Sequence, residues 1–150
     1  MTHAFKCHYF HLIWSTKKRE KMILPIFRDK LYAYMGGIIR KKGAHLLQIG
    51  GIEDHVHLLV SIGNLDNFSD IIRDVKTGAS RWIHQEFPEY KSFGWQEGCG
   101  SYTVSYSNVQ GVKKYIMNQE KHHKTQTFEE EYISFLKMQG IPFDPRFVFD

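Results

Sequence analysis

Hydrophobic and polar positions divide the chain into segments with two different periods. Aromatic and branched side chains occupy both faces of residues 5–15, which predicts a central strand. Residues 44–52 and 55–62 have the same character, and because only two residues separate them we expect a tight antiparallel hairpin. Residues 101–106 predict a short fourth strand.

Apolar residues at three- and four-residue intervals predict two helices between these strands. The first spans residues 26–42 and ends in basic side chains followed by Gly43, which suits a helix C-terminus. The second spans residues 68–87. The order β-α-β-β-α-β is that of a ferredoxin-like (RRM-like) α+β fold, an antiparallel sheet with both helices on one face. We expect the other face to be open.

Two capping boxes predict two further helices after the fourth strand. Ser107-Asn108-Val109-Gln110 has the required spacing, and the helix that it begins carries Tyr115. Thr127-Phe128-Glu129-Glu130 begins another helix, which runs to about residue 139. A chain of this length is large enough to bury one core, so we expect residues 1–150 to form a single domain.

Composition limits the class of protein and the cellular compartment that we expect. Hydrophobic residues make up 42% and charged residues 24% of the chain, as in ordinary globular proteins. The net charge of +4 permits a polyanionic partner but does not establish one. Cys7 and Cys99 are too few for a disulfide framework, and no apolar run reaches the roughly 18 residues of a membrane span. The first residues lack the apolar region of a signal peptide. We therefore expect a cytoplasmic protein with no membrane partner.

The most informative stretch is Asp54-His55-Val56-His57-Leu58-Leu59-Val60. Successive side chains of a strand point to opposite faces, so His55 and His57 share one face and the apolar residues between them share the other. Two imidazoles at this spacing can bind one divalent metal if a third ligand comes from elsewhere. Ordinary strand histidines have the same pattern, so the motif alone does not decide the function.

The helix predicted after the fourth strand offers the missing partner. Tyr115 and Gln119 are four residues apart and therefore share a helix face, with His122 and His123 one turn further. A tyrosine hydroxyl can act as a nucleophile, and a glutamine carbonyl oxygen with two imidazoles could hold Mg²⁺ or Mn²⁺. Taken alone, Tyr115 could equally pack at the edge of the core and Gln119 could lie on the surface.

Taken together, these motifs resemble the HUH single-tyrosine transposases of the insertion-sequence 200/605 (IS200-like) type and the related REP-associated tyrosine transposases. The resemblance rests on His55-Val56-His57 followed by Tyr115-Ile116-Met117-Asn118-Gln119 and runs from about residue 5 to residue 125. Four further segments support it: His11-Leu12-Ile13-Trp14-Ser15-Thr16, Arg81-Trp82, Trp95-Gln96-Glu97-Gly98 and Ser105-Tyr106-Ser107-Asn108.

The resemblance implies a metal-dependent transposase that cuts and rejoins single-stranded DNA. His55, His57 and Gln119 would bind the divalent metal, Mg²⁺ or Mn²⁺. Tyr115 would attack the scissile phosphate, giving a 5′-phosphotyrosine and a free 3′-OH. Rejoining would reverse this step without a nucleotide cofactor. Members of this family act as homodimers on single-stranded DNA with hairpin ends, so we expect both partners here.

Basic and histidine side chains near Tyr115 and on the second predicted helix are candidates for contact with the DNA backbone. A solvated helix face has the same composition, so each assignment is a hypothesis. The candidates are Lys113, Lys114, Lys121, His122, His123, Arg73, Lys76 and Arg81. When bound to DNA, the protein would be associated with the nucleoid.

Two other classes of protein share parts of this pattern. Histidine-triad nucleotide hydrolases also contain His-x-His, but they need a third alternating histidine where this chain has Leu59. A non-catalytic nucleic-acid-binding module, or a domesticated relative of a transposase, could use an open sheet. The presence of both histidines together with Tyr115 and Gln119 favours an active enzyme. Covalent trapping on DNA separates these classes.

Overall fold

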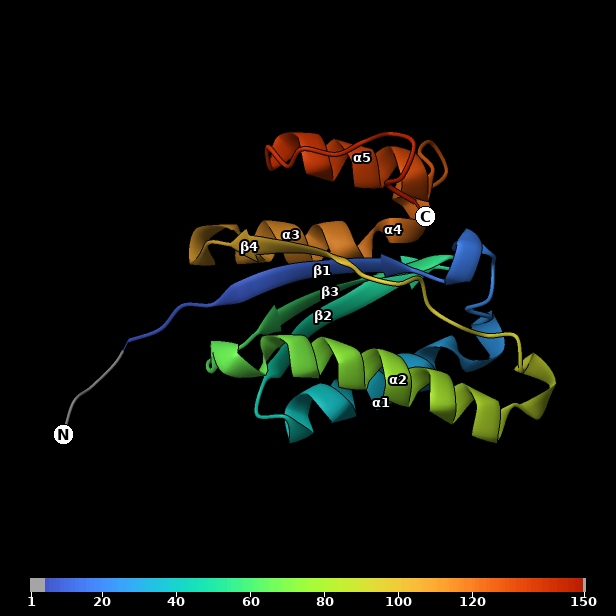
Figure 1. Ribbon diagram of the computed structural model, residues 1–150. Helices are drawn as coiled ribbons and strands as arrows, with labels where there is room; N and C mark the ends of the chain where they lie inside the picture. Colours follow the sequence, from blue (N-terminus) through green and yellow to red (C-terminus); the bar gives the residue numbers. More distant parts are fainter. Residues whose placement is uncertain (1–4, 150) are drawn as a thin grey trace.

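A four-stranded antiparallel sheet lies between two layers of helices in the computed structural model, which describes residues 5–149 (Figure 1). The strands stand in the order β2-β3-β1-β4 across the sheet. They are β1 (Tyr9–Ser15), β2 (His45–Ile52), β3 (His55–Ser61) and β4 (Gly100–Val104). With α1 (Pro25–Lys41) and α2 (Phe68–Glu86), the chain has the predicted order β-α-β-β-α-β. The α+β fold class is confirmed.

The main core lies between the sheet and the layer formed by α1 and α2 (Figure 1). The β3 residues Val56, Leu58 and Val60 are completely buried in it, as their alternation along the strand predicts. Across the sheet, β3 pairs with both β1 and β2, so it is a central strand. None of the helices in the described part of the chain combines the length and apolarity needed to cross a membrane.

The opposite face of the sheet is covered, so the expectation of an open face was wrong. Three helices cover it: α3 (Val109–Met117), α4 (Gln119–His122) and α5 (Phe128–Met138) (Figure 1). Leu59 on β3 packs against Ile116 on α3, and Ile13 on β1 packs with Phe128 on α5. The alternation of residues along a strand specifies which side chains share a face, but it does not specify which distant segment packs on them.

Helix α3 lies very close to the sheet at Gly50 on β2. A Cβ atom at this position would lie 2.4 Å from the carbonyl oxygen of Ile116 and 3.1 Å from its side chain. Only a residue without a side chain allows the helix to lie this close to the strand. Gly50 therefore sets the position of α3, and with it that of Tyr115, which precedes Ile116 in the chain.

The ends of the C-terminal helices differ from the prediction in two places. Ser107 does not cap α3; its hydroxyl lies 3.1 Å from that of Ser105, and a 3₁₀ turn precedes the helix. The helix breaks at Asn118, so Tyr115 and Gln119 lie on consecutive helices rather than on one. By contrast, the Thr127 capping box is confirmed.

Candidate active site

The histidines of β3 point into the layer between the sheet and the C-terminal helices. His55 and His57 are both 0% exposed, and their ring centroids are 5.1 Å apart. The residue between them, Val56, packs on the other side of the sheet. The strand therefore presents the two imidazoles side by side, as its sequence predicts.

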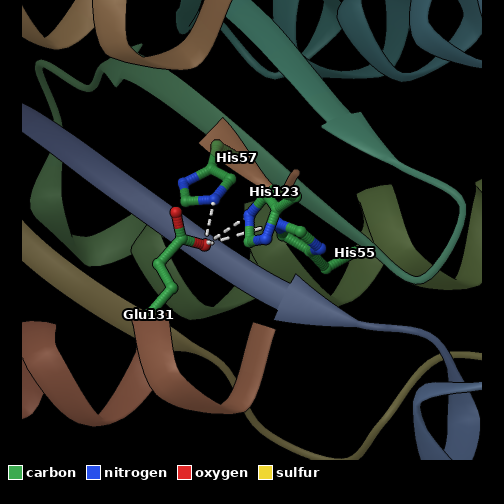
Figure 2. A group of neighbouring side chains, drawn as sticks. All are labelled: His55, His57, His123 and Glu131. Carbon is green, nitrogen blue, oxygen red and sulfur yellow. Dashed lines mark hydrogen bonds and ion pairs between the residues drawn. The ribbon is translucent and has the colours of Figure 1, made fainter. Parts of the chain in front are cut away.

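The carboxylate of Glu131 on α5 lies at the centre of the histidines (Figure 2). Its Oε1 atom lies 2.8 Å from Nε2 of His57, 3.2 Å from Nε2 of His123 and 3.4 Å from Nε2 of His55. One donor atom from each of these four residues lies within 4.8 Å of the others. We call His55, His57, His123 and Glu131 the donor cluster.

Gln119 lies against two of these imidazole nitrogens, those of His55 and His123. Its carbonyl oxygen is 3.1 Å from Nε2 of His55 and 2.9 Å from Nε2 of His123, and the residue is 1% exposed. Its amide group donates to the backbone carbonyl of Tyr115 at 3.3 Å. The structure thus brings Gln119 to His55 on β3 and to His123, which follows α4.

The hydroxyl of Tyr115 reaches the donor cluster as well. It donates a hydrogen bond to Oε2 of Glu131, and Nε2 of His122 lies 3.1 Å from both oxygens. The Tyr115 and His57 rings are 5.7 Å apart between centroids. Tyr115 also borders a cavity of about 350 Å³ whose lining includes His11 and Phe135. One chain therefore assembles the tyrosine, the histidines and an adjoining space.

The outer ring nitrogen of each β3 histidine has its own partner. Nδ1 of His55 lies 2.7 Å from Oδ1 of Asp54, and Nδ1 of His57 lies 2.8 Å from Nε2 of His11 on β1. Both rings consequently turn Nε2 toward the centre of the cluster. Histidines that bind metals are commonly held in this way, with the second nitrogen fixed by an outer partner.

Burial and mutual contact determine the protonation of the site. Burial would raise the pKa of Glu131, but hydrogen bonds with His123, His55 and His57 outweigh it and hold that pKa well below its usual range. Burial lowers the pKa of His57 to about 4. For His55 the hydrogen bonds to Asp54 and Glu131 outweigh burial and raise the pKa to about 9.

The pKa of the Tyr115 hydroxyl is shifted in the opposite direction to that of the Glu131 carboxylate. Burial, together with the hydrogen bond to the Glu131 carboxylate, raises the pKa of Tyr115 well above its usual range. At neutral pH the site therefore contains an ionised carboxylate and a protonated tyrosine.

The donors fit a divalent metal ion. Imidazole nitrogens and carboxylate and amide oxygens are common metal ligands, and here they converge on one buried point. The residues that could hold such an ion are His55, His57, His123, Glu131 and Gln119.

Comparison with known proteins identifies the family. The model of the family described as "Transposase IS200 like" matches residues 4–119. The chain belongs to the IS200-like transposase family. The resemblance seen in the sequence is thereby confirmed, and the protein is an enzyme of the transposase class. This family uses a divalent metal, and the donor cluster provides suitable ligands.

Individual relatives agree with this assignment. The IS200-like chain is 27% identical over 115 residues to the ISDra2 transposase TnpA of Deinococcus radiodurans, covering 73% of this chain and 82% of the relative. A crystal structure of a Deinococcus radiodurans R1 protein described as a transposase has a TM-score of 0.61 at 24% identity, covering 79% of this chain and 96% of that one. A REP-associated tyrosine transposase bound to a REP hairpin has a TM-score of 0.61 at 14% identity, covering 82% and 74%. The two structures show the shared fold alone.

The residues expected to contact DNA lie on both helical layers of this IS200-like transposase. One group lies on α3, α4 and the residue that follows, on the layer that contains Tyr115: Lys113, Lys114, Lys121, His122 and His123. Arg73, Lys76 and Arg81 lie on α2, on the other side of the sheet (Figure 1).

Four of these side chains already have protein partners, and one of the four, His122, contacts Tyr115 and Glu131. Arg73 forms an ion pair with Asp74 at 3.2 Å, and the ammonium group of Lys76 donates to the carbonyl oxygen of Gln96 at 2.8 Å. The side chain of His123 is 2% exposed. The structure therefore places His123 in the donor cluster rather than on the surface.

The positions of Glu131 in the donor cluster and of His11 beside His57 were not predicted from the sequence. Glu131 lies three residues after Phe128 and four before Phe135, so it belongs to the apolar stripe of α5, where an ionised side chain is unusual. His11 lies in a strand whose flanking residues are apolar on both faces. In each case the available signal was a polar residue at a position predicted to be buried.

Proposed function

We propose that this chain is a metal-dependent transposase of single-stranded DNA in which Tyr115 is the nucleophile and His55, His57 and Gln119 hold the metal. The observation that carries the proposal is the convergence of the tyrosine hydroxyl and the imidazole nitrogens on the single carboxylate of Glu131. The family match, which includes all four proposed residues, supports it.

The proposed reaction exchanges one phosphoester for another. The Tyr115 oxygen attacks the scissile phosphorus, the bond to the 3′ oxygen breaks, and its electron pair leaves with that oxygen, which takes a proton to become a free 3′-OH. The tyrosine proton passes to Nε2 of His122, which lies 3.1 Å from the hydroxyl, while the ionised carboxylate of Glu131 orients the hydroxyl through its hydrogen bond. When bound, the metal polarises the phosphate oxygens and stabilises the charge that develops on them. A second 3′-OH reverses the step, so no nucleotide cofactor is needed.

Neighbouring side chains prepare the site for this step. Asp54 and His11 hold the imidazoles with Nε2 toward the centre. The Phe135 ring packs edge to face against that of Tyr115, with 5.8 Å between the ring centroids. Preorganised groups of this kind lower the cost of bringing a nucleophile and a phosphate together.

We propose that DNA approaches along α3 and α4. Lys114 and Lys121 are exposed on these helices and can neutralise backbone phosphates, while Lys113 is half-buried beside them. The REP-associated tyrosine transposase was solved bound to a REP hairpin, which supports a substrate with hairpin ends. The resemblance to the family supports a homodimer that acts in the cytoplasm and uses Mg²⁺ or Mn²⁺ as its cofactor. Arg73, Lys76 and Arg81 would then contact a part of the DNA that reaches the α2 layer.

Covalent trapping tests the proposed function. Labelled single-stranded hairpin DNA from the region flanking the gene is incubated with the protein and Mg²⁺ or Mn²⁺, then separated by denaturing electrophoresis. We expect a shifted band for the wild type and for Tyr106→Phe, a matched control because Tyr106 is 73% exposed. The band should vanish in Tyr115→Phe and on chelation, while native gels still show DNA binding by Tyr115→Phe. DNA binding by the wild type without any covalent band would overturn the proposal in favour of a non-catalytic module.

A further inference from the structure

We propose that Glu131 is itself a ligand of the metal and that it links the metal to the Tyr115 nucleophile. This inference rests on the proposed function, because it assigns a further residue to the same centre. The family match ends at Gln119, so Glu131 and the whole of α5 lie outside the matched segment. The assignment therefore comes from the structure of this chain.

Charge is the first argument for Glu131. Neutral imidazoles and the amide oxygen of Gln119 bring no negative charge to a divalent cation. Mg²⁺ and Mn²⁺ favour sites with a carboxylate in addition to the phosphate oxygens of the substrate. Asp54 contacts Nδ1 of His55 on the outer side of the ring and does not face the centre. Glu131 is the carboxylate that belongs to the donor cluster.

Position is the second argument. One oxygen of Glu131 faces Nε2 of His55, His57 and His123, the nitrogens that the outer partners leave free for a metal (Figure 2). Glu131 is 1% exposed, and a carboxylate is costly to bury unless it serves charged or hydrogen-bonding partners. A carboxylate in a merely structural contact would not need to reach three ring nitrogens at once.

Helix α5 is held firmly enough to present this side chain. Its residue Glu129 forms an ion pair with Arg19 at 3.0 Å, and Phe128 is buried against the sheet with Ile13. The Thr127 capping box fixes the start of the helix, four residues before Glu131. Helix α5 is therefore part of the site and not only a cover over the sheet.

The second carboxylate oxygen explains the position of the nucleophile. Oε2 accepts the hydrogen bond from Tyr115, while Oε1 faces the imidazoles. If Oε1 binds the metal while Oε2 keeps its hydrogen bond to the hydroxyl, one side chain would both hold the ion and orient the attacking oxygen. Tyr115 and the metal are then positioned by the same rigid group.

Titration of the DNA-free protein with Mn²⁺ tests the ligand role without using activity. Glu131→Gln keeps the shape of the side chain and removes its charge, and we expect the affinity for Mn²⁺ to fall by about 10-fold or more, as for loss of a group that supports a metal site. Glu130→Gln is the matched control, because it removes the same charge from the residue that precedes Glu131. Glutamine at this position can still form the capping box with Thr127. We expect its affinity to match that of the wild type. Unchanged or tighter binding by Glu131→Gln would overturn the inference.

A cysteine variant tests ligation directly and guards against misfolding of Glu131→Gln. With Co²⁺, Glu131→Cys should show a thiolate-to-cobalt charge-transfer absorption, since a thiolate at this position would bind the metal. Ser134→Cys, at an exposed position of the same helix, should not show this absorption. The wild type shows whether the native thiols of Cys7 and Cys99 contribute to it. A folded Glu131→Cys protein that binds Co²⁺ without this absorption would contradict ligation.

The two proposals fail in different ways. If Tyr115→Phe abolishes the covalent band while Glu131→Gln binds Mn²⁺ like the wild type, the proposed function stands and the role of Glu131 is wrong. If Glu131→Gln loses Mn²⁺ but the wild type binds DNA and never forms the covalent band, Glu131 is a ligand and the proposed reaction is wrong.

Discussion

His11 and His57 are joined through their ring nitrogens, with Nε2 of His11 2.8 Å from Nδ1 of His57. The two residues lie on adjacent strands, β1 and β3, and are 3% and 0% exposed. Burial lowers the pKa of His11 to about 3 and that of His57 to about 4, so both rings are neutral at neutral pH. For Nε2 of His57 to bind a metal, Nδ1 must carry the ring proton and donate it to His11.

Replacing His11 should therefore weaken metal binding although His11 is not a ligand. His11→Phe keeps the aromatic contact with Phe135 but leaves the Nδ1 proton of His57 without an acceptor. We expect the affinity for Mn²⁺ to fall by about 10- to 100-fold, the usual effect of removing an outer partner of a metal-binding histidine. Calorimetric titration measures it, with His45→Phe on the exposed end of β2 as the control. Equal affinities for wild type and His11→Phe would show that the contact does not orient the ring.

The metal-free protein should lose stability as the pH falls from 7 toward 4. In the unfolded chain His11 and His57 take up protons near pH 6.5, whereas in the folded protein their pKa values are lowered to about 3 and 4. The unfolded state therefore binds more protons in this window, and the free energy of unfolding falls by on the order of 6 kcal/mol, about half from each histidine.

The contribution of His55 to the free energy of unfolding has the opposite dependence on pH, and it is nearly constant between pH 6.5 and 4. Its pKa is raised to about 9, so its contribution is complete below pH 6.5 and is lost only as the pH rises through 9. Urea unfolding in the presence of a chelator measures both effects. His11→Phe should show a shallower decline between pH 7 and 4; an equally steep decline would mean that other groups cause it.

Gly50→Ala should displace the tyrosine helix. The added methyl group would meet the carbonyl oxygen of Ile116 at 2.4 Å, so α3 must move away from β2. We expect a loss of about 1–3 kcal/mol in the free energy of unfolding and a larger relative loss of covalent-band formation, because Tyr115 is carried on α3. Gly37→Ala on α1 is the control, since no atom lies within 4 Å of its new methyl group. Full activity of Gly50→Ala would show that the close approach does not position Tyr115.

The local features of this fold could be predicted from the sequence. The alternation of His55 and His57 with apolar residues correctly placed both rings on one face, and the helical period gave α1 and α2 within one or two residues of their ends. The Thr127 capping box was also correct, because the two residues that form it are close in sequence. At Ser107 the same spacing occurs without the cap, since a 3₁₀ turn takes the place of the first helical turn.

The long-range features could not be predicted in the same way. Glu131 contacts His57 from 74 residues away, and His11 contacts it from 46 residues away. No periodicity links such positions, so the sequence indicated a metal site made of His55, His57 and Gln119 alone. The break at Asn118 was missed for a related reason: the amide of Gln119 turns toward His55, and this tertiary contact competes with a continuous helix.

Peptide mapping of the covalent complex tests whether Tyr115 is the nucleophile. The wild type is reacted with hairpin DNA and Mn²⁺, digested with a protease and a nuclease, and analysed by tandem mass spectrometry. We expect one nucleotide-bearing peptide, with the phosphate on the oxygen of Tyr115, and no such peptide when the metal is chelated. Attachment to any other residue, such as Tyr106, or an adduct of equal yield without metal, would contradict it.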